Sequence, residues 1–277
     1  MAIRDNVEVR RLIDQASQNP DIQDLVGQLY QLLGSPRTLP DQIEVDGVMR
    51  PTTNSEGRQI HPTEEGVINF WRWFGESKVV DEQGRPLVVY HGSPDARFVG
   101  NEGVFLTPAQ RLRLSYGRDV GSGAFWFAKD FSTAKSYADP RRAFDYQVAQ
   151  EGVVKAYLRL TDPLVIDATG KEWRDAQALG KTSDVIEQAQ ADGNDGAIIR
   201  NVRDNYNNSK GTRATTTYTV FDSSQIKSAT GNDGTFSADT GNILFQSDQT
   251  DTPGFQAWSN GHPVIPMDAG PVFEAGE

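Results

Sequence analysis

The segment Tyr90-His91-Gly92-Ser93 carries the residues best suited to chemistry in this sequence. It closes an apolar run, so we expect a strand that ends near His91. Such a histidine can hold its imidazole over a cleft, and a following residue without Cβ lets a ligand approach the backbone closely. Some 35 residues later, Gly121-Ser122-Gly123 leads into Ala124-Phe125-Trp126-Phe127, and the next segment ends at Tyr137. Together the two stretches predict a flat aromatic ligand held between rings and fixed by backbone amides.

The composition excludes several other kinds of site. The 277 residues include no cysteine, which rules out disulfides, thiolate zinc sites and cysteine nucleophiles. The three histidines are scattered without close acidic partners, which argues against a metal site, and we expect His61 and His262 to be exposed. The net charge of −11 argues against general affinity for nucleic acids. This charge is still compatible with a local basic groove, for which the candidate residues are Arg111, Arg113, Arg118, Arg141 and Arg142.

The sequence gives no sign of membrane insertion. Its apolar runs are much shorter than the roughly 20 residues that a spanning helix needs, and the N-terminus lacks a secretory h-region. We therefore expect a soluble protein without a membrane partner. Its location is then the cytoplasm of the producing cell, or of a host cell after delivery by a phage or a secretion system.

Changes in composition along the chain predict four segments. Apolar periodicity over 5–17 and 21–33, interrupted by Pro20, predicts a helical hairpin. The next stretch is rich in Pro, Gly, Asn and Thr and lacks periodicity, and the last is polar, acidic and contains proline. The segments are a helical module (1–34), a linker (35–61), a folded domain (62–236) and a flexible tail or further linker (237–277).

Within the central domain, short strands alternate with a few helices. Pro62-Thr63-Glu64-Glu65 is typical of a helix start, and Gly75 of a helix end. Apolar residues 79–80 and 87–90 bracket a polar turn, which predicts a hairpin. Further strands are expected at 153–160, 164–167, 197–199 and 218–221, with helices at 183–191 and from Asp130 or Ser132 to Tyr137. This order predicts an α+β fold with a mixed or split sheet.

The ordered motifs resemble the ADP-ribosyltransferase fold, in the diphtheria-toxin and poly(ADP-ribose) polymerase branch with its His–Tyr–Glu triad. The resemblance rests on Tyr-His-Gly-Ser at 90–93, on Gly-Ser-Gly at 121–123 before Trp126-Phe127-Ala128, and on Tyr137 eleven residues after Trp126. It covers about 62–232. More loosely the chain is similar to such domains in phage-borne multidomain proteins, whose closing signature the stretch 225–236 resembles. The implied fold has split mixed or antiparallel sheets with flanking helices, behind the helical N-terminal module.

The resemblance implies NAD as substrate, no metal, and a role for each matched residue. His91 would bind the adenosine-side ribose, and the backbone of Gly92 the nicotinamide carboxamide. Trp126 takes the place of the triad tyrosine, and Tyr137 that of the second ring stacked on nicotinamide. The remaining implied NAD-binding residues are Tyr90, Ser93, Arg97, Gly123 and Phe127. The family's carboxamide-binding serine falls at Ala134, where Ser132 or Ser136 would have to substitute.

The triad glutamate falls at Thr217, and residues 213–217 contain no carboxylate. Without it the resemblance implies mono-ADP-ribosyl transfer rather than polymer synthesis, with Thr217 as a hydrogen-bonding substitute. The acceptor would be a macromolecule, protein or nucleic acid, and the chain part of a larger phage or effector protein, such as a toxin. The alternatives are an NAD glycohydrolase, a degenerate module that binds NAD or ADP-ribose, and a structural or delivery protein of a phage.

Overall fold

The computed structural model describes residues 39–94, 105, 123–139, 152–175, 180–206, 213–232, 234–239, 241–243, 258–259 and 262–263. The chain divides into two compact units, residues 1–246 and 247–277. The helices expected at 5–17 and 21–33 and the five arginines of the candidate basic groove lie outside the described residues.

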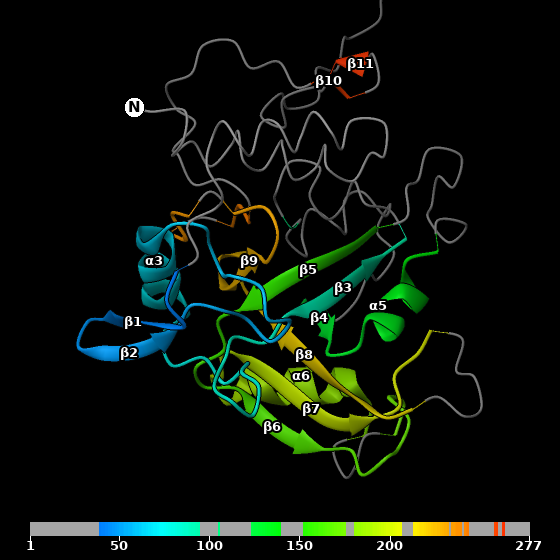
Figure 1. The fold of residues 1–277 in the computed structure, drawn as a ribbon. Coiled ribbons are helices and arrows are strands. Elements are labelled where there is room, and N and C mark those ends of the chain that lie inside the picture. The colour runs from blue at the N-terminus through cyan, green and yellow to red at the C-terminus, as the bar shows by residue number, and fades with distance from the viewer. Residues whose placement is uncertain are drawn as a thin grey trace, which may run out of the picture. The chain divides into compact units, whose positions relative to one another are not determined.

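The described part of the first unit is built on a seven-stranded mixed sheet (Figure 1). The strands lie in the order β6-β7-β8-β4-β3-β5-β9, and all neighbours run antiparallel except the parallel pair β6–β7. The predicted α+β class with a mixed sheet is therefore confirmed. The strands are β3 (Val89–Ser93), β4 (Phe125–Ala128), β5 (Gly152–Leu158), β6 (Leu164–Asp167), β7 (Gly196–Val202), β8 (Thr215–Val220) and β9 (Ile226–Ser228).

Among the described residues of this unit, the α-helices lie where their sequence signals predict them. They are α3 (Glu64–Phe74), α5 (Phe131–Tyr137) and α6 (Thr182–Ala191), together with the short 3₁₀ helix η6 (Ser223–Gln225). The Thr63 hydroxyl caps α3 by accepting from the Gly66 N–H at 3.1 Å, and Gly75 ends it with φ 56°. Threonine and glycine at these positions satisfy backbone groups that a helix end leaves unpaired.

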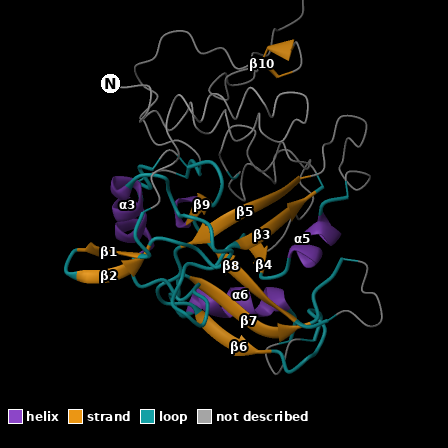
Figure 2. Cartoon of the chain, viewed as in Figure 1, coloured by secondary structure: helices purple, strands orange, loops and turns teal. Residues whose placement is uncertain are grey.

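The segment 39–61, expected to be a linker, is instead part of the folded unit. Its strands β1 (Gln42–Val45) and β2 (Val48–Pro51) form an antiparallel hairpin beside α3 (Figure 2). Ile43 and Val45 point into the aromatic core that α3 contributes, and Trp71 donates its indole N–H to the Pro51 carbonyl at 2.8 Å. Strands of four residues, in a segment rich in proline and glycine, are too short to show a clear alternation of apolar and polar residues. The linker expectation is therefore wrong from residue 39 onward.

His61 is buried, contrary to its expected exposure. Only 3% of its surface is accessible, and its Nδ1 lies 2.9 Å from the Thr63 hydroxyl. Its ring also meets Phe236 edge-on, with centroids 6.3 Å apart. The irregular segment that carries His61 thus packs between the start of α3 and the closing segment of the domain.

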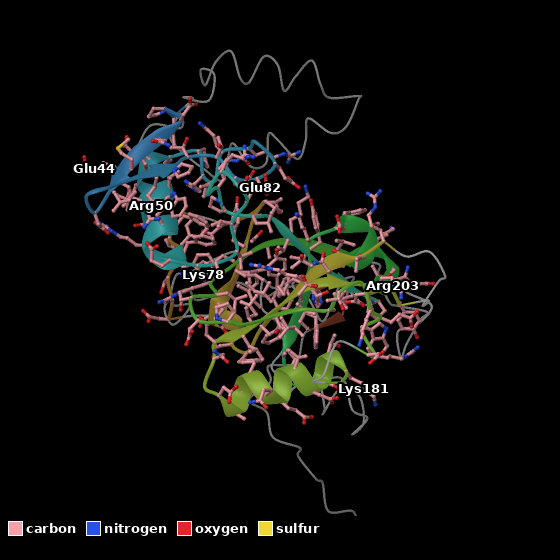
Figure 3. The ribbon with its side chains drawn as sticks, turned by 90° about the horizontal axis from the view of Figure 1, so that it is seen from below. Glu44, Arg50, Lys78, Glu82, Lys181 and Arg203 are labelled. Atoms are coloured by element: carbon pink, nitrogen blue, oxygen red, sulfur yellow. The ribbon has the colours of Figure 1, made fainter. Side chains whose placement is uncertain are left out.

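Strand alternation sorts the side chains of the sheet onto two faces. Phe125 and Phe127 of β4 belong to a core cluster that also includes Val89 and Tyr218. Trp126 lies on the opposite face, where α6 covers the sheet (Figures 1 and 3). The residues of that second cluster are Ala124, Ala168, Val185, Ile186, Ala189, Ala197, Ile199 and Val202.

Strand β3 continues past His91, contrary to the expectation of a strand that ends there. Five residue pairs join β3 to β5, from Val89–Ala156 to Ser93–Gly152, so the partner strand supports the whole His-Gly-Ser segment. On its other side β3 pairs with β4 only at Tyr90 and Ala128. The expected hairpin before β3 is confirmed by an antiparallel bridge between Val80 and Pro86.

In the second unit, β10 (Trp258–Ser259) and β11 (His262–Pro263) form a short antiparallel hairpin within the expected tail. Among the residues that the structure describes, no helix is both long enough and apolar enough to cross a membrane.

The packing of the β1–β2 hairpin predicts that Ile43→Ala destabilises the domain. Ile43 is buried, and removing a buried isoleucine side chain costs about 2–5 kcal/mol in the free energy of unfolding. Val48→Ala is the matched control, because Val48 lies on the same hairpin with 48% exposure and should change stability by less than about 0.5 kcal/mol. Urea unfolding measures both. Equal, negligible effects would mean that the hairpin does not contribute to the core.

Candidate functional site

The absence of a side chain at Gly92 allows α5 to lie directly on β3. A Cβ built on Gly92 would stand 1.8 Å from the Ala134 carbonyl oxygen, far inside van der Waals contact. The obstacle is helix backbone, which cannot move aside as a flexible side chain can. Gly92 therefore fixes the distance between strand and helix at this point.

The His91 side chain connects β3 to β4 at the point where the backbone pairing of these two strands ends. Its Nδ1 lies 2.7 Å from the Trp126 carbonyl oxygen and donates to it, so Nε2 is an acceptor in the neutral ring. Phe105 and Phe127 contact the imidazole with centroid distances of 5.2 Å and 5.4 Å. The ring is thus held in one orientation by a hydrogen bond and two aromatic side chains.

The structure places Trp126 and Thr217 on the α6 side of the sheet. Trp126 is half-buried against the α6 cluster, and Thr217 pairs with Ile199 of that cluster across β7 and β8. Tyr137, the last residue of α5, is also half-buried, and its ring meets Tyr206 edge-on with centroids 5.8 Å apart. Contact between the rings of Trp126 and Tyr137 is not found in the described part of the chain.

A carboxylate that the sequence analysis missed joins two of the predicted residues. Asp204, just after β7, accepts a hydrogen bond from the Tyr137 hydroxyl, and its Oδ2 lies 3.3 Å from the Thr217 hydroxyl. Burial raises the pKa of Asp204, while the hydrogen bonds from Tyr137 and Thr217 act in the opposite direction. The family motif has its carboxylate at the position of Thr217 on β8, whereas Asp204 follows β7, so the motif gave no indication of Asp204.

Other predicted site residues have structural partners. The Tyr90 hydroxyl donates to Glu56 at 2.7 Å, and burial together with this bond raises the pKa of Tyr90 to about 12. Phe127 is fully buried beneath His91, and Ser93 is buried at the end of β3. Gly123 takes a left-handed φ of 74° before β4, a conformation that glycine adopts without strain.

Two serines were considered as replacements for the carboxamide-binding serine at Ala134. Ser136 donates to the Thr133 carbonyl of its own helix at 2.7 Å and accepts from the N–H of Tyr206, outside the helix, at 3.2 Å, so its hydroxyl already has two partners. Ser132 is exposed in the first turn of α5. Arg97 and the first residues of the glycine-rich stretch, Gly121 and Ser122, lie outside the described residues. The described side chains also include no group of three or more His, Cys, Asp or Glu suited to a metal ion.

Comparison with known families identifies the family to which this fold belongs. Residues 81–236, more than half of the chain, match the family described as ADP-ribosyltransferase in polyvalent proteins. The chain belongs to this ADP-ribosyltransferase family. The fold predicted from the Tyr-His-Gly-Ser and Trp126–Tyr137 motifs is thereby confirmed. Comparisons with curated proteins and with solved structures gave no match.

The matched range of the ADP-ribosyltransferase family starts after α3. The β1–β2 hairpin and α3 precede residue 81, yet they share a core with Tyr157 and Phe236 inside the matched range. The Asn54 side chain donates to the buried Tyr157 hydroxyl at 2.8 Å. In this chain the transferase domain therefore packs against a preceding segment.

The contact between Gly92 and Ala134 predicts that Gly92→Ala displaces α5. We expect a loss of about 1–3 kcal/mol in unfolding free energy, because a methyl group must be forced into a filled space. Hydrogen exchange of the amides in 131–137 should rise selectively.

Gly84→Ala is the control for this variant. Gly84 has φ 75° and open space around it, so alanine there adds about 1–2 kcal/mol of backbone strain in an exposed turn. It should destabilise the protein to a similar degree without selective exchange in α5. Equal exchange profiles for the two variants would contradict the close contact.

The raised pKa of Asp204 predicts that Asp204→Asn stabilises the fold at neutral pH. Below 3.8, the ordinary value, the stabilising contribution of the protonated group is fully present, and it is lost as pH rises through the raised value. Asparagine can accept from the Tyr137 hydroxyl through its amide oxygen and donate to the Thr217 hydroxyl through its amide nitrogen, without a buried charge. Thermal unfolding should show a higher midpoint for the variant at neutral pH, with a smaller gap at about pH 4.5. A lower midpoint at neutral pH would show that the carboxylate stabilises the protein.

Proposed function

We propose that this chain transfers a single ADP-ribose unit from NAD to a macromolecular acceptor. Membership of the ADP-ribosyltransferase family supports the transferase activity. The observation that carries the proposal is the meeting of Tyr137, Thr217 and Asp204 on the face that also holds Trp126. Two aromatic rings and a polar cluster on one face suit a substrate with a flat cationic ring and a ribose.

The reaction breaks the bond between the nicotinamide nitrogen and C1′ of the adjoining ribose. Positive charge develops on the sugar as the bond lengthens, so the site must hold both sides of the bond and exclude water. Trp126 and Tyr137 offer faces to the cationic nicotinamide ring, each by stacking and cation–π attraction worth roughly 1–2 kcal/mol. An acceptor nucleophile then attacks the electron-poor C1′.

The β3 segment supplies the binding groups for the rest of NAD in this proposal. His91, whose ring is oriented by the bond from Nδ1 to the Trp126 carbonyl, binds a hydroxyl of the adenosine-side ribose in this proposal. Gly92 presents its backbone to the carboxamide, and Ser93 lies beside the riboses. Arg97 carries a guanidinium suited to the pyrophosphate.

Threonine at position 217 supports single transfer over chain elongation. Its hydroxyl can form a hydrogen bond to a ribose hydroxyl but has no charge with which to activate a second ribose. The acceptor is a protein side chain or a nucleic acid. We place the chain in a larger phage or effector protein that acts in the cytoplasm of its producer or of a host cell, in keeping with the polyvalent proteins of the family description.

A second candidate function is binding of NAD or ADP-ribose without turnover. The observation that favours it is the uncharged Thr217 at the position of the triad glutamate. Hydrolysis to free ADP-ribose is a variant of the first function in which water is the acceptor. A remnant that serves as a phage structural or delivery protein would bind no nucleotide.

Incubation of the protein with biotin-labelled NAD and cell lysate tests the proposal. We expect labelled macromolecules together with release of nicotinamide, because transfer forms both products in equal amounts. Free ADP-ribose without a labelled acceptor would identify a glycohydrolase. NAD binding by calorimetry without nicotinamide release would identify a binding module, and no binding at all would exclude every NAD-dependent function.

Removal of the Tyr137 ring should weaken NAD binding. We expect Tyr137→Ala to raise the KM for NAD about tenfold, the equivalent of the roughly 1–2 kcal/mol assigned to one ring. Phe131→Ala is the control on the same helix, since Phe131 is an aromatic residue with 50% exposure at the start of α5. Steady-state nicotinamide release measures both variants, and an unchanged KM in Tyr137→Ala would remove Tyr137 from the binding site.

A further inference from the structure

We infer that Asp204 is the catalytic carboxylate of this site, acting from the end of β7 in place of a residue on β8. The inference rests on the proposed NAD-dependent transfer. Its geometric basis is that Asp204 contacts Tyr137, the residue predicted to stack on nicotinamide, and Thr217, the residue at the position of the triad glutamate. A position that reaches both residues also reaches a sugar held between them.

An irregularity in the sheet lies just before Asp204. Ile199 pairs with Thr217 and Val202 with Thr215, so β7 carries one residue more than β8 over the same stretch. Such a bulge bends its strand and redirects the side chains that follow. Asn201 lies within the bulge with φ 52°, and its side chain donates to Asp167 at 2.6 Å, which anchors the distortion. In Figure 3 the labelled Arg203 marks the chain just before Asp204.

The surroundings of Asp204 are unfavourable for a purely structural aspartate. Its hydrogen-bond partners in the described part of the chain are two hydroxyls, and it has no ion pair there with a cationic side chain. An ionised carboxylate in such surroundings destabilises the fold, as its raised pKa shows. Strained or costly groups that face a ligand site are typical of function. A substrate that becomes positively charged would compensate for the missing cation.

The two hydroxyls orient the carboxylate and leave part of it available to accept further hydrogen bonds. An ionised carboxylate has about four lone-pair sites, and Tyr137 and Thr217 use two of them. The remaining sites can accept from the ribose 2′-hydroxyl and face the charge on C1′. Tyr137, which we assign to the nicotinamide, is thereby tied to the same group that stabilises the sugar.

The chemical step balances with the groups named. The C1′–N1 bond breaks, its electron pair leaves with nitrogen to give neutral nicotinamide, and positive charge passes to C1′ and the ring oxygen. The carboxylate of Asp204 stabilises that charge electrostatically and forms no covalent bond. The acceptor oxygen or nitrogen then bonds to C1′ and releases its proton to solvent. No oxidant, reductant or metal ion takes part.

Asp130 is another carboxylate beside β8 in the described part of the chain, and its geometry is less suitable. It accepts from the Thr215 hydroxyl at 2.5 Å, two residues along the strand from Thr217. It is exposed to solvent at the start of α5, where water screens its charge. Asp204 is the better-shielded group and the one in contact with Tyr137.

The test compares nicotinamide release from NAD by the wild-type chain and by Asp204→Asn. We expect release to fall about 10²- to 10³-fold, the loss typical when one preorganised electrostatic contact to a transition state is removed. The dissociation constant for NAD, measured by calorimetry, should change by less than about tenfold, since the charge that Asp204 stabilises develops after binding. Asp204→Glu keeps the charge and should retain more activity than Asp204→Asn.

Asp195→Asn is the matched control. Asp195 precedes the other end of β7, and its carboxylate also accepts two hydrogen bonds, both from Thr161. This variant should keep wild-type nicotinamide release per folded molecule. Because Asp204→Asn is expected to melt higher than wild type, loss of activity in it cannot be attributed to unfolding.

The outcomes separate the inference from the proposed function. Wild-type release with undiminished release by Asp204→Asn would overturn the role of Asp204 alone. An equal loss of nicotinamide release in Asp195→Asn would also overturn it, because the loss would then reflect a general disturbance of β7. Absence of release by the wild type would overturn the transferase proposal and this inference with it.

Discussion

The hydrogen bonds of Asp204 hold together the end of α5, the end of β7 and the start of β8. Tyr137 reaches the carboxylate from the helix and Thr217 from the neighbouring strand, so three elements far apart in sequence meet at one group. The position of the Tyr137 hydroxyl depends on this meeting. Burial of the charge opposes it, which means that packing elsewhere must supply the stability that keeps the three elements in place.

That packing comes from both faces of the sheet and from the segment before the transferase domain. One face carries the phenylalanines that orient His91, and the other carries the α6 cluster that supports Trp126. The close approach of α5 to β3 at Gly92 brings the helix that ends in Tyr137 over the segment assigned to NAD. The single pair between β3 and β4 ends their ladder beside His91. The Tyr-His-Gly-Ser motif therefore depends on how closely the backbone of β3 approaches its neighbours as well as on its side chains.

The sequence could predict the elements with strong local signals and the motif residues that lie on them. Thr63 and Gly75 mark the ends of α3, and the α+β class and transferase fold follow from motif order. The hairpin at 42–51 was missed because its strands are too short to show a period, and His61 because its burial depends on distant Phe236. The contact of Asp204 with Thr217 could not be predicted from the local sequence. An unbroken register from the Ile199–Thr217 pair would place Asp204 five residues past Thr217, roughly 16 Å away.

The structure of the protein with bound NAD, or with an NAD analogue that resists cleavage, tests the central claim most directly. The account predicts nicotinamide between Trp126 and Tyr137, its carboxamide at the backbone of Gly92, and a ribose 2′-hydroxyl within hydrogen-bond distance of Asp204. Nicotinamide bound elsewhere, or a ribose turned away from Asp204 and Thr217, would contradict it.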